Sequence, residues 1–154
     1  MQFSPVRDDP LYDALKPVVS GLGMVLLELS VSKHRSSVQV RVTVYKAGTV
    51  GIRDCSKVHR AIVPRLDLAF PDQELSVEVM SPGIDRNIKD ASEFINYIGR
   101  GVRCYRTDVS DWVSGIVSGA DTERLLLETK EGILELNYGI IAKAKLDYSQ
   151  EVKN

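Results

Sequence analysis

The chain has 154 residues, of which 44% are hydrophobic and 27% charged, and this ordinary globular composition excludes a disordered tail or a fibre. No apolar run approaches the roughly 20 residues of a membrane-spanning helix, and residues 1–5 lack the basic start and apolar block of a signal peptide, so we expect a soluble cytoplasmic protein. The net charge of −1 argues against a protein that coats nucleic acid indiscriminately.

The first predicted element is a helix that begins at Pro10. Asp9 is a favourable N-cap residue, and proline suits the first helical position because its missing N–H would lack a partner there anyway. Pro17 removes a hydrogen bond inside this helix, so we expect a kink there or an end before Gly21. The helix would bury apolar residues that recur at helical spacing, namely Leu11, Ala14, Leu15, Val18 and Leu22.

Two strands joined by a hairpin at residues 34–36 are predicted next. Apolar and polar residues alternate from residue 27 to 31 and again from 38 to 45, which is the pattern of strands with one buried face.

A second helix is predicted after Gly51. Its outer face is basic, with Lys57 and Arg60, and we expect Pro64 to bend or shorten its last turn. The buried stripe of this helix would be Ile52, Cys55, Val58, Ile62 and Leu66.

A third strand around Val77 leads into Ser81-Pro82-Gly83, which predicts a tight turn at the strand exit. Pro82 fixes φ and Gly83 can adopt a positive φ, so the pair favours a type II turn. This turn would hold Asp85 and Arg86 next to each other at the end of the strand. The three strands and two helices predict an α+β layer for residues 1–89.

The pattern of predicted elements changes at residue 90, from helices and long strands to a short helix and several short strands. Asp90 and Glu93 have the spacing of a capping box, so a short helix over residues 90–99 should begin there and bury Phe94. Five short strands are then predicted, at 102–105, 112–117, 125–128, 133–136 and 141–146. Strands this short and closely spaced predict a small β-barrel of the SH3 or Sm type, so residues 90–154 should form a second domain.

Charge is distributed unevenly between these two predicted domains. Residues 1–89 contain 12 Lys and Arg against 10 Asp and Glu, a net charge of +2. Residues 90–154 contain 8 against 11, a net charge of −3. Any contact with RNA must therefore come from local patches of basic residues.

No catalytic, metal or cofactor motif is evident. Cys55 and His59 share a helix face, but two ligands do not make a metal site, and we expect Cys55 and Cys104 to be free structural thiols. The cations Lys57, Arg60, Arg86 and Lys89 form a candidate binding patch, with a plain solvated surface as the alternative. We interpret Trp112 as a core or rim residue of the barrel, with a platform for base stacking as the alternative.

Several segments in order resemble the RimP family of bacterial ribosome maturation factors. Residues 81–86, S-P-G-I-D-R, look like the family's S-P-G-L-D-R, and residues 54–60 look like part of its D-D-C-x-x-V-S-R helix segment. Residues 99–102, 114–117 and 141–146 resemble its G-R-x-V, its x-G-x-L strand and its closing I-x-K-A-R-L. Met80, His59 and Asn87 depart from the family pattern.

This resemblance implies an N-terminal α+β domain joined to an Sm-like barrel, in a non-enzymatic monomer without a cofactor. It also implies binding to the free small ribosomal subunit during late assembly, at ribosomal RNA and a ribosomal protein near the decoding region. The predicted partner-binding residues are Ser81, Pro82, Gly83, Asp85, Arg86, Lys57, Arg60 and Lys89.

Arg86 is the predicted clamp for a phosphate or carboxylate, partly exposed and oriented by Asp85, because a guanidinium presents paired donors to either group. If these two residues satisfy only each other, the functional surface shifts to Lys57, Arg60 and Lys89. Two other functions stay open: an Sm-like RNA chaperone whose barrel forms a ring, and a hydrolase that uses Ser81 or Cys55.

Overall fold

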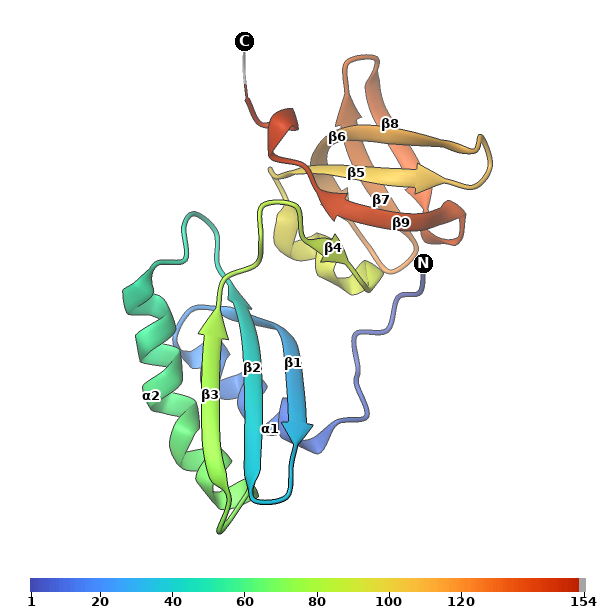
Figure 1. Cartoon of the computed structure of the whole chain (residues 1–154). Helices are drawn as coiled ribbons and strands as arrows, with labels where there is room; N and C mark the ends of the chain where they lie inside the picture. Colours follow the sequence, from blue (N-terminus) through green and yellow to red (C-terminus); the bar gives the residue numbers. More distant parts are fainter. Residues whose placement is uncertain (153–154) are drawn as a thin grey trace. The chain divides into compact units, whose positions relative to one another are not determined.

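The computed structural model describes residues 1–152 and divides into two compact units. The first unit is Arg7–Pro82, and the second combines Met1–Val6 with Gly83–Asn154 (Figure 1). The chain therefore passes from one unit to the other twice, after Val6 and after Pro82. Our expectation that residues 1–89 and 90–154 are separate domains stays a prediction.

The first unit is a three-stranded sheet with two helices, so the predicted α+β class is confirmed. The elements are α1 (Pro10–Gly21), β1 (Val25–Lys33), β2 (Ser37–Tyr45), α2 (Ile52–Ala69) and β3 (Glu74–Met80). The sheet order is β1-β2-β3: β2 is antiparallel to β1 across the hairpin and parallel to β3, which it reaches through α2. Figure 1 shows both helices on one face of this sheet.

The core of the first unit lies between that face and the helices. Alternation in β2 places four valines on the covered face, and each is at most 2% exposed. They pack with Leu15 and Val19 of α1 and with Val58, Ile62 and Leu66 of α2.

Both internal prolines are tolerated without shortening their helices. Of the two alternatives expected at each proline, the early end is wrong, since the helices continue to Gly21 and Ala69. The other alternative, a kink at Pro17 and a bend at Pro64, stays a prediction. Each proline is exposed, as is the residue four positions before it, Asp13 or Arg60. Water can therefore satisfy the carbonyl group that the proline leaves without a donor.

The second unit is built on one antiparallel sheet of six strands in the order β4-β9-β5-β6-β7-β8. The strands are β4 (Asn87–Ile88), β5 (Gly101–Arg106), β6 (Asp111–Ala120), β7 (Arg124–Thr129), β8 (Gly132–Asn137) and β9 (Ile141–Leu146). The last five correspond to the predicted strands, whereas β4 has only two residues and was not predicted.

This sheet is strongly curved. In a flat sheet, the four strand spacings between β9 and β8 would separate those strands by about 19 Å. Only the 3₁₀ turn η2 (Tyr138–Ile140) joins them, and its few residues span roughly 8 Å. The connection therefore requires the sheet to bend back on itself, with Leu125, Leu127 and Leu136 fully buried inside.

Two short segments complete the second unit. The predicted helix over residues 90–99 is a 3₁₀ helix, η1 (Ala91–Tyr97), and η3 (Tyr148–Gln150) follows β9. The arm Met1–Val6 packs against the same unit: the Phe3 ring stacks on Tyr138 at 6.1 Å between centroids, and the Ser4 amide donates to Asp90 at 3.0 Å. No helix in residues 1–152 is long and apolar enough to cross a membrane.

Candidate functional site

The predicted site residues are divided between the two units. Ser81, Lys57 and Arg60 belong to the first unit with Pro82, and the remaining four, Gly83, Asp85, Arg86 and Lys89, belong to the second. We therefore describe each group within its own unit.

The basic face of α2 is positioned by the helix start. Asp54 accepts a hydrogen bond from the Gly51 amide at 2.9 Å and an ion pair from Lys46 Nζ at 3.0 Å. These contacts, first the backbone hydrogen bond and then Lys46, lower the pKa of Asp54. Asp54 thus fixes the first turn of α2 to the end of β2, and so fixes where the following side chains project.

Lys57 and Arg60 are both exposed on α2, as predicted for a binding surface. Arg60 lines an open hollow of about 650 Å³ between the first half of α2 and the end of β3, and Ser81 lines the same hollow. Lys57 is not among its lining residues. The walls are mixed, with apolar and polar side chains: Val50, Ile52, Cys55, His59, Val79 and Met80.

Ile52 corrects the predicted apolar stripe of α2. The stripe is buried at Val58, Ile62 and Leu66, but Ile52 is 86% exposed at the hollow. A helical pattern identifies the face of a residue, but not whether the neighbouring sheet extends far enough to cover it. An exposed isoleucine at the hollow that Arg60 also lines is the part of this surface that the sequence did not predict.

The turn after β3 lies two residues later than predicted. Gly83 does not have a positive φ, so the prediction of a type II turn with Gly83 in the left-handed region is wrong. Instead, the Gly83 carbonyl accepts from the Arg86 amide at 3.1 Å, which makes Ile84 and Asp85 the central residues. Ile84 and Asp85 are exposed at the tip of this turn.

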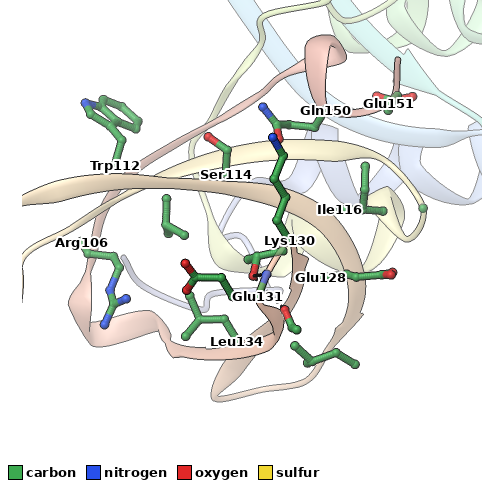
Figure 2. A pocket seen from close by; sticks show the side chains of 16 residues that line it. Arg106, Trp112, Ser114, Ile116, Glu128, Lys130, Glu131, Leu134, Gln150 and Glu151 are labelled. Carbon is green, nitrogen blue, oxygen red and sulfur yellow. Dashed lines mark hydrogen bonds between the residues drawn. The ribbon is translucent and has the colours of Figure 1, made fainter. Parts of the chain in front are cut away.

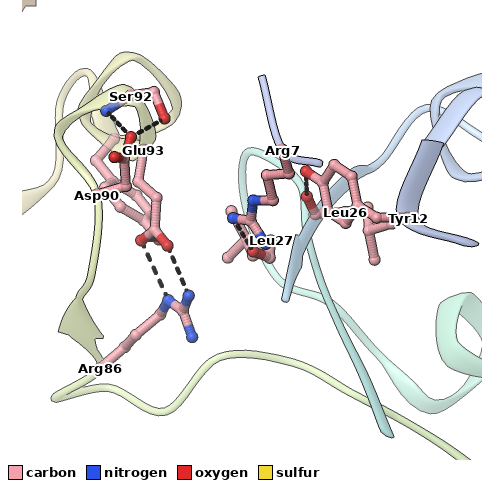
Figure 3. Close-up of polar contacts among 9 residues, drawn as sticks. Arg7, Tyr12, Leu26, Leu27, Arg86, Asp90, Ser92 and Glu93 are labelled. Atoms are coloured by element: carbon pink, nitrogen blue, oxygen red, sulfur yellow. Dashed lines mark hydrogen bonds and ion pairs between the residues drawn. The ribbon is translucent and has the colours of Figure 1, made fainter. Parts of the chain in front are cut away.

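Arg86 is half-buried as a residue, but its side chain is more enclosed than expected. Its side chain is 8% exposed and forms a two-pronged ion pair with Glu93, which is 4% exposed. Arg86 Nη2 donates to Glu93 Oε1 at 2.7 Å, and Nε donates to Oε2 at 3.3 Å (Figure 3). The expected partner was Asp85, whereas the structure places this paired contact on Glu93.

Further contacts integrate the Arg86–Glu93 pair into the second unit. The Tyr97 hydroxyl donates to Glu93 Oε2 at 3.3 Å, and burial together with the Glu93 charge raises the pKa of Tyr97. The Arg86 carbonyl accepts from the Leu146 amide of β9 at 3.0 Å. Arg86 therefore holds the turn, β9 and η1 together.

Glu93 has a different role from the one that its spacing predicted. Asp90 caps η1 by accepting from the Ser92 amide at 3.0 Å, and Figure 3 shows Ser92 bonded to it. The predicted capping box also required the Glu93 carboxylate to reach back to Asp90, but that carboxylate binds Arg86. The sequence indicated that Glu93 had a partner and gave the wrong one.

The two cysteines are free and lie in different units, Cys55 on α2 and Cys104 on β5. Burial raises the pKa of Cys55, with a contribution from Asp54, and burial alone raises the pKa of the fully buried Cys104 to about 12. Residues 1–152 contain no group of three or more His, Cys, Asp or Glu arranged to hold a metal ion.

These environments predict unequal thiol reactivity. Because a thiolate is the reactive form, and only Cys55 is partly accessible, we expect Ellman's reagent to modify one thiol per native chain, slowly at pH 8, and two after unfolding. A mass spectrum of the partly labelled protein should place the label on Cys55. Rapid modification of both thiols in the native protein would contradict this expectation.

Comparison with known proteins extends over both units. Residues 14–85 match the family model described as the RimP N-terminal domain. The chain is also similar to proteins named ribosome maturation factor RimP. The relative from Borrelia turicatae (strain 91E135) is 25% identical over 141 residues, covering 92% of this chain and 96% of the relative.

Two further relatives carry the same name. That from Borrelia recurrentis (strain A1) is 25% identical over 88% of this chain and 93% of its own length. That from Borrelia hermsii (strain HS1 / DAH) is 26% identical over 92% of this chain and 96% of its own length. The similarity therefore covers both units of the fold.

Proposed function

Because the chain belongs to the RimP family of ribosome maturation factors, we propose that it binds the free small ribosomal subunit and assists its late assembly without catalysing a reaction. The observation that carries this proposal is similarity over 92% of the chain to a ribosome maturation factor. We further propose that it acts as a cytoplasmic monomer and needs no cofactor.

Within this function, the exposed site residues of each unit would contribute contacts of their own. Lys57 and Arg60 offer cations to ribosomal RNA phosphates, and the hollow beside Ile52 would accept an apolar side chain of a ribosomal protein. The turn at Gly83, with Asp85, and the strand exit at Ser81 and Pro82 would add polar contacts, as would Lys89. Arg86 would support the surface by holding the turn.

We also propose that the curved sheet of the second unit closes into a small Sm-like barrel. The support is the short connection between β8 and β9, which brings strands from distant positions in the sheet order together. In the order β9-β5-β6-β7-β8, the last strand along the chain, β9, pairs with β5, the first of these five strands along the chain. A five-stranded barrel needs this order.

Gradient sedimentation tests the proposed function. A tagged full-length chain should migrate with free small subunits, and not with complete ribosomes, in a sucrose gradient of cell lysate. Lys57→Gln with Arg60→Gln should weaken this association and reduce the slope of log K against log salt by about 1 for each lost phosphate contact.

Lys16→Gln with Arg65→Gln is the matched control, because it removes two exposed cations from helices of the same unit but from other positions. The control should migrate like the parent. Migration of the parent at the top of the gradient, or with translating ribosomes, would contradict the proposed function. A ring-sized species on a sizing column would favour the Sm-like chaperone instead.

A further inference from the structure

The outward side of the second unit's sheet brings cations and aromatic rings into two neighbouring rows. In β5, Val102 and Cys104 are fully buried, so Arg103 and Tyr105 point to the opposite side of the sheet. The strand register then aligns Lys145, Arg103 and Ser114 across β9, β5 and β6 in one row, and Lys143, Tyr105 and Trp112 in the next. We call Arg103, Tyr105, Trp112, Lys143 and Lys145 the outer face.

Trp112 is the prominent member of the outer face. Trp112 is 43% exposed, so of the two predicted positions, core or rim of the barrel, the core is excluded. Tyr105 meets the ring edge-on at 5.5 Å between centroids, and the Arg103 guanidinium lies 5.4 Å from the ring centre. An indole that is oriented by its neighbours and open to solvent can stack against a flat ligand.

The cations of the outer face form no close ion pair with a carboxylate in residues 1–152, although the charges of Arg103 and Asp147 attract each other. Arg103 and Lys145 lie directly opposite each other on paired strands, and like charges in that arrangement are destabilising. Within residues 1–152, no carboxylate forms an ion pair with Arg103, Lys143 or Lys145, and Arg103 Nε is shielded from solvent without a hydrogen-bond partner. A bound anion would reduce the repulsion between Arg103 and Lys145 and would supply a hydrogen-bond partner for Arg103 Nε.

An open hollow of about 1130 Å³ over β6, β7 and β8 adjoins the outer face, since Trp112 and Ser114 line it (Figure 2). The charged residues of its lining are mixed: Glu128, Glu131 and Glu151 are acidic, and Arg106 and Lys130 are basic. A polyanion would therefore extend from Trp112 toward β9, where Arg103, Lys143 and Lys145 lie. The net charge of −3 for residues 90–154 is thus compatible with a local cationic surface.

We propose that the outer face binds a segment of single-stranded RNA. A base stacks on Trp112, and phosphates contact Arg103, Lys143 and Lys145. An exposed aromatic ring beside three cations fits a polyanion that has flat bases better than an acidic peptide, which offers charge without rings to stack. The choice of RNA among nucleic acids rests on the proposed function.

The test uses the purified full-length chain and an oligouridylate of about ten nucleotides. Trp112 is the single tryptophan, so quenching of intrinsic fluorescence reports stacking at this position. Trp112→Leu should weaken binding, measured by anisotropy of the labelled oligonucleotide, roughly 5- to 150-fold. Lys143→Gln with Lys145→Gln should reduce the salt slope by about 0.7 for each lost phosphate contact.

Arg124→Gln is the matched control, because Arg124 is an exposed cation of the same unit that lies neither on the outer face nor at the hollow lined by Trp112, and it should bind like the parent. Circular dichroism should show that every variant is folded. The proposal is overturned if the oligouridylate does not bind, if Trp112 fluorescence is unchanged, or if the double lysine variant binds like the parent. Equal quenching by an oligoglutamate peptide would also overturn it and identify an acidic protein segment as the ligand.

Sedimentation and RNA binding together distinguish failure of the proposed function from failure of the outer-face proposal. RNA binding by the purified chain without migration on free small subunits would support the proposal for the outer face and contradict the proposed function. Migration on small subunits, with no RNA binding at Trp112, would support the proposed function and contradict the proposal for the outer face.

Discussion

Arg86→Ala should lower the free energy of unfolding of the second unit by about 3–5 kcal/mol, which is the usual cost of removing one partner from a buried ion pair. Glu93 is 4% exposed and would lose both guanidinium bonds without gaining access to water. Urea unfolding followed by the fluorescence of Trp112, which lies in the same unit, measures this loss.

Two variants show that burial of the pair is the cause. Arg106→Ala removes an ion pair to Asp108 of the same 2.7 Å length, but its side chains are 22% and 38% exposed, so the expected cost is at most about 1 kcal/mol. Arg86→Met with Glu93→Leu removes both charges and should be much milder than Arg86→Ala. An unchanged unfolding midpoint for Arg86→Ala would restore Arg86 as a candidate contact residue.

Gly115→Ala should destabilise the second unit by about 2–3 kcal/mol. An added Cβ would lie 2.4 Å from the Glu128 carbonyl oxygen and 3.0 Å from Leu127 Cγ. The closer atom belongs to the backbone of β7, which pairs with β6 at this point, so relief requires a shift of one strand against the other. Urea unfolding of the variant measures the cost.

Gly83→Ala is the contrasting substitution. Its added Cβ would lie 3.4 Å from Asp85 Oδ1, which is ordinary contact, and Gly83 does not have a positive φ. We expect its free energy of unfolding to stay within about 0.5 kcal/mol of the parent. If Gly83→Ala and Gly115→Ala lowered the free energy of unfolding equally, the close strand contact at Gly115 would not be the cause of its expected loss.

The elements that the sequence predicted well are those whose pattern repeats over many residues. The four valines of β2 and the stripe Val58, Ile62 and Leu66 of α2 are buried as their spacing predicted. These patterns report which face of an element is apolar, and a two-layer fold buries that face wherever a neighbour covers it. Ile52 shows the limit, because the same stripe continues to a residue that remains exposed.

The errors at the candidate site arise from contacts that depend on chain register. The Pro-Gly pair predicted a turn, but the hydrogen bond from the Arg86 amide to the Gly83 carbonyl places the turn two residues later. The partner of Arg86 depends on where β4 pairs with β9, and a strand of two residues has no readable pattern. Local spacing alone therefore did not predict that Arg86 and Glu93 pair with each other.

The arm Met1–Val6 has a consequence for dissecting the protein into fragments. The second unit is discontinuous in sequence, since the first unit lies between its arm and Gly83. A fragment that starts at Gly83 would expose the face of Tyr138 on which Phe3 stacks and would remove the Ser4 amide from Asp90. Poor solubility or binding of such a fragment would therefore measure a missing piece of its own fold, and not the separate behaviour of an intact domain.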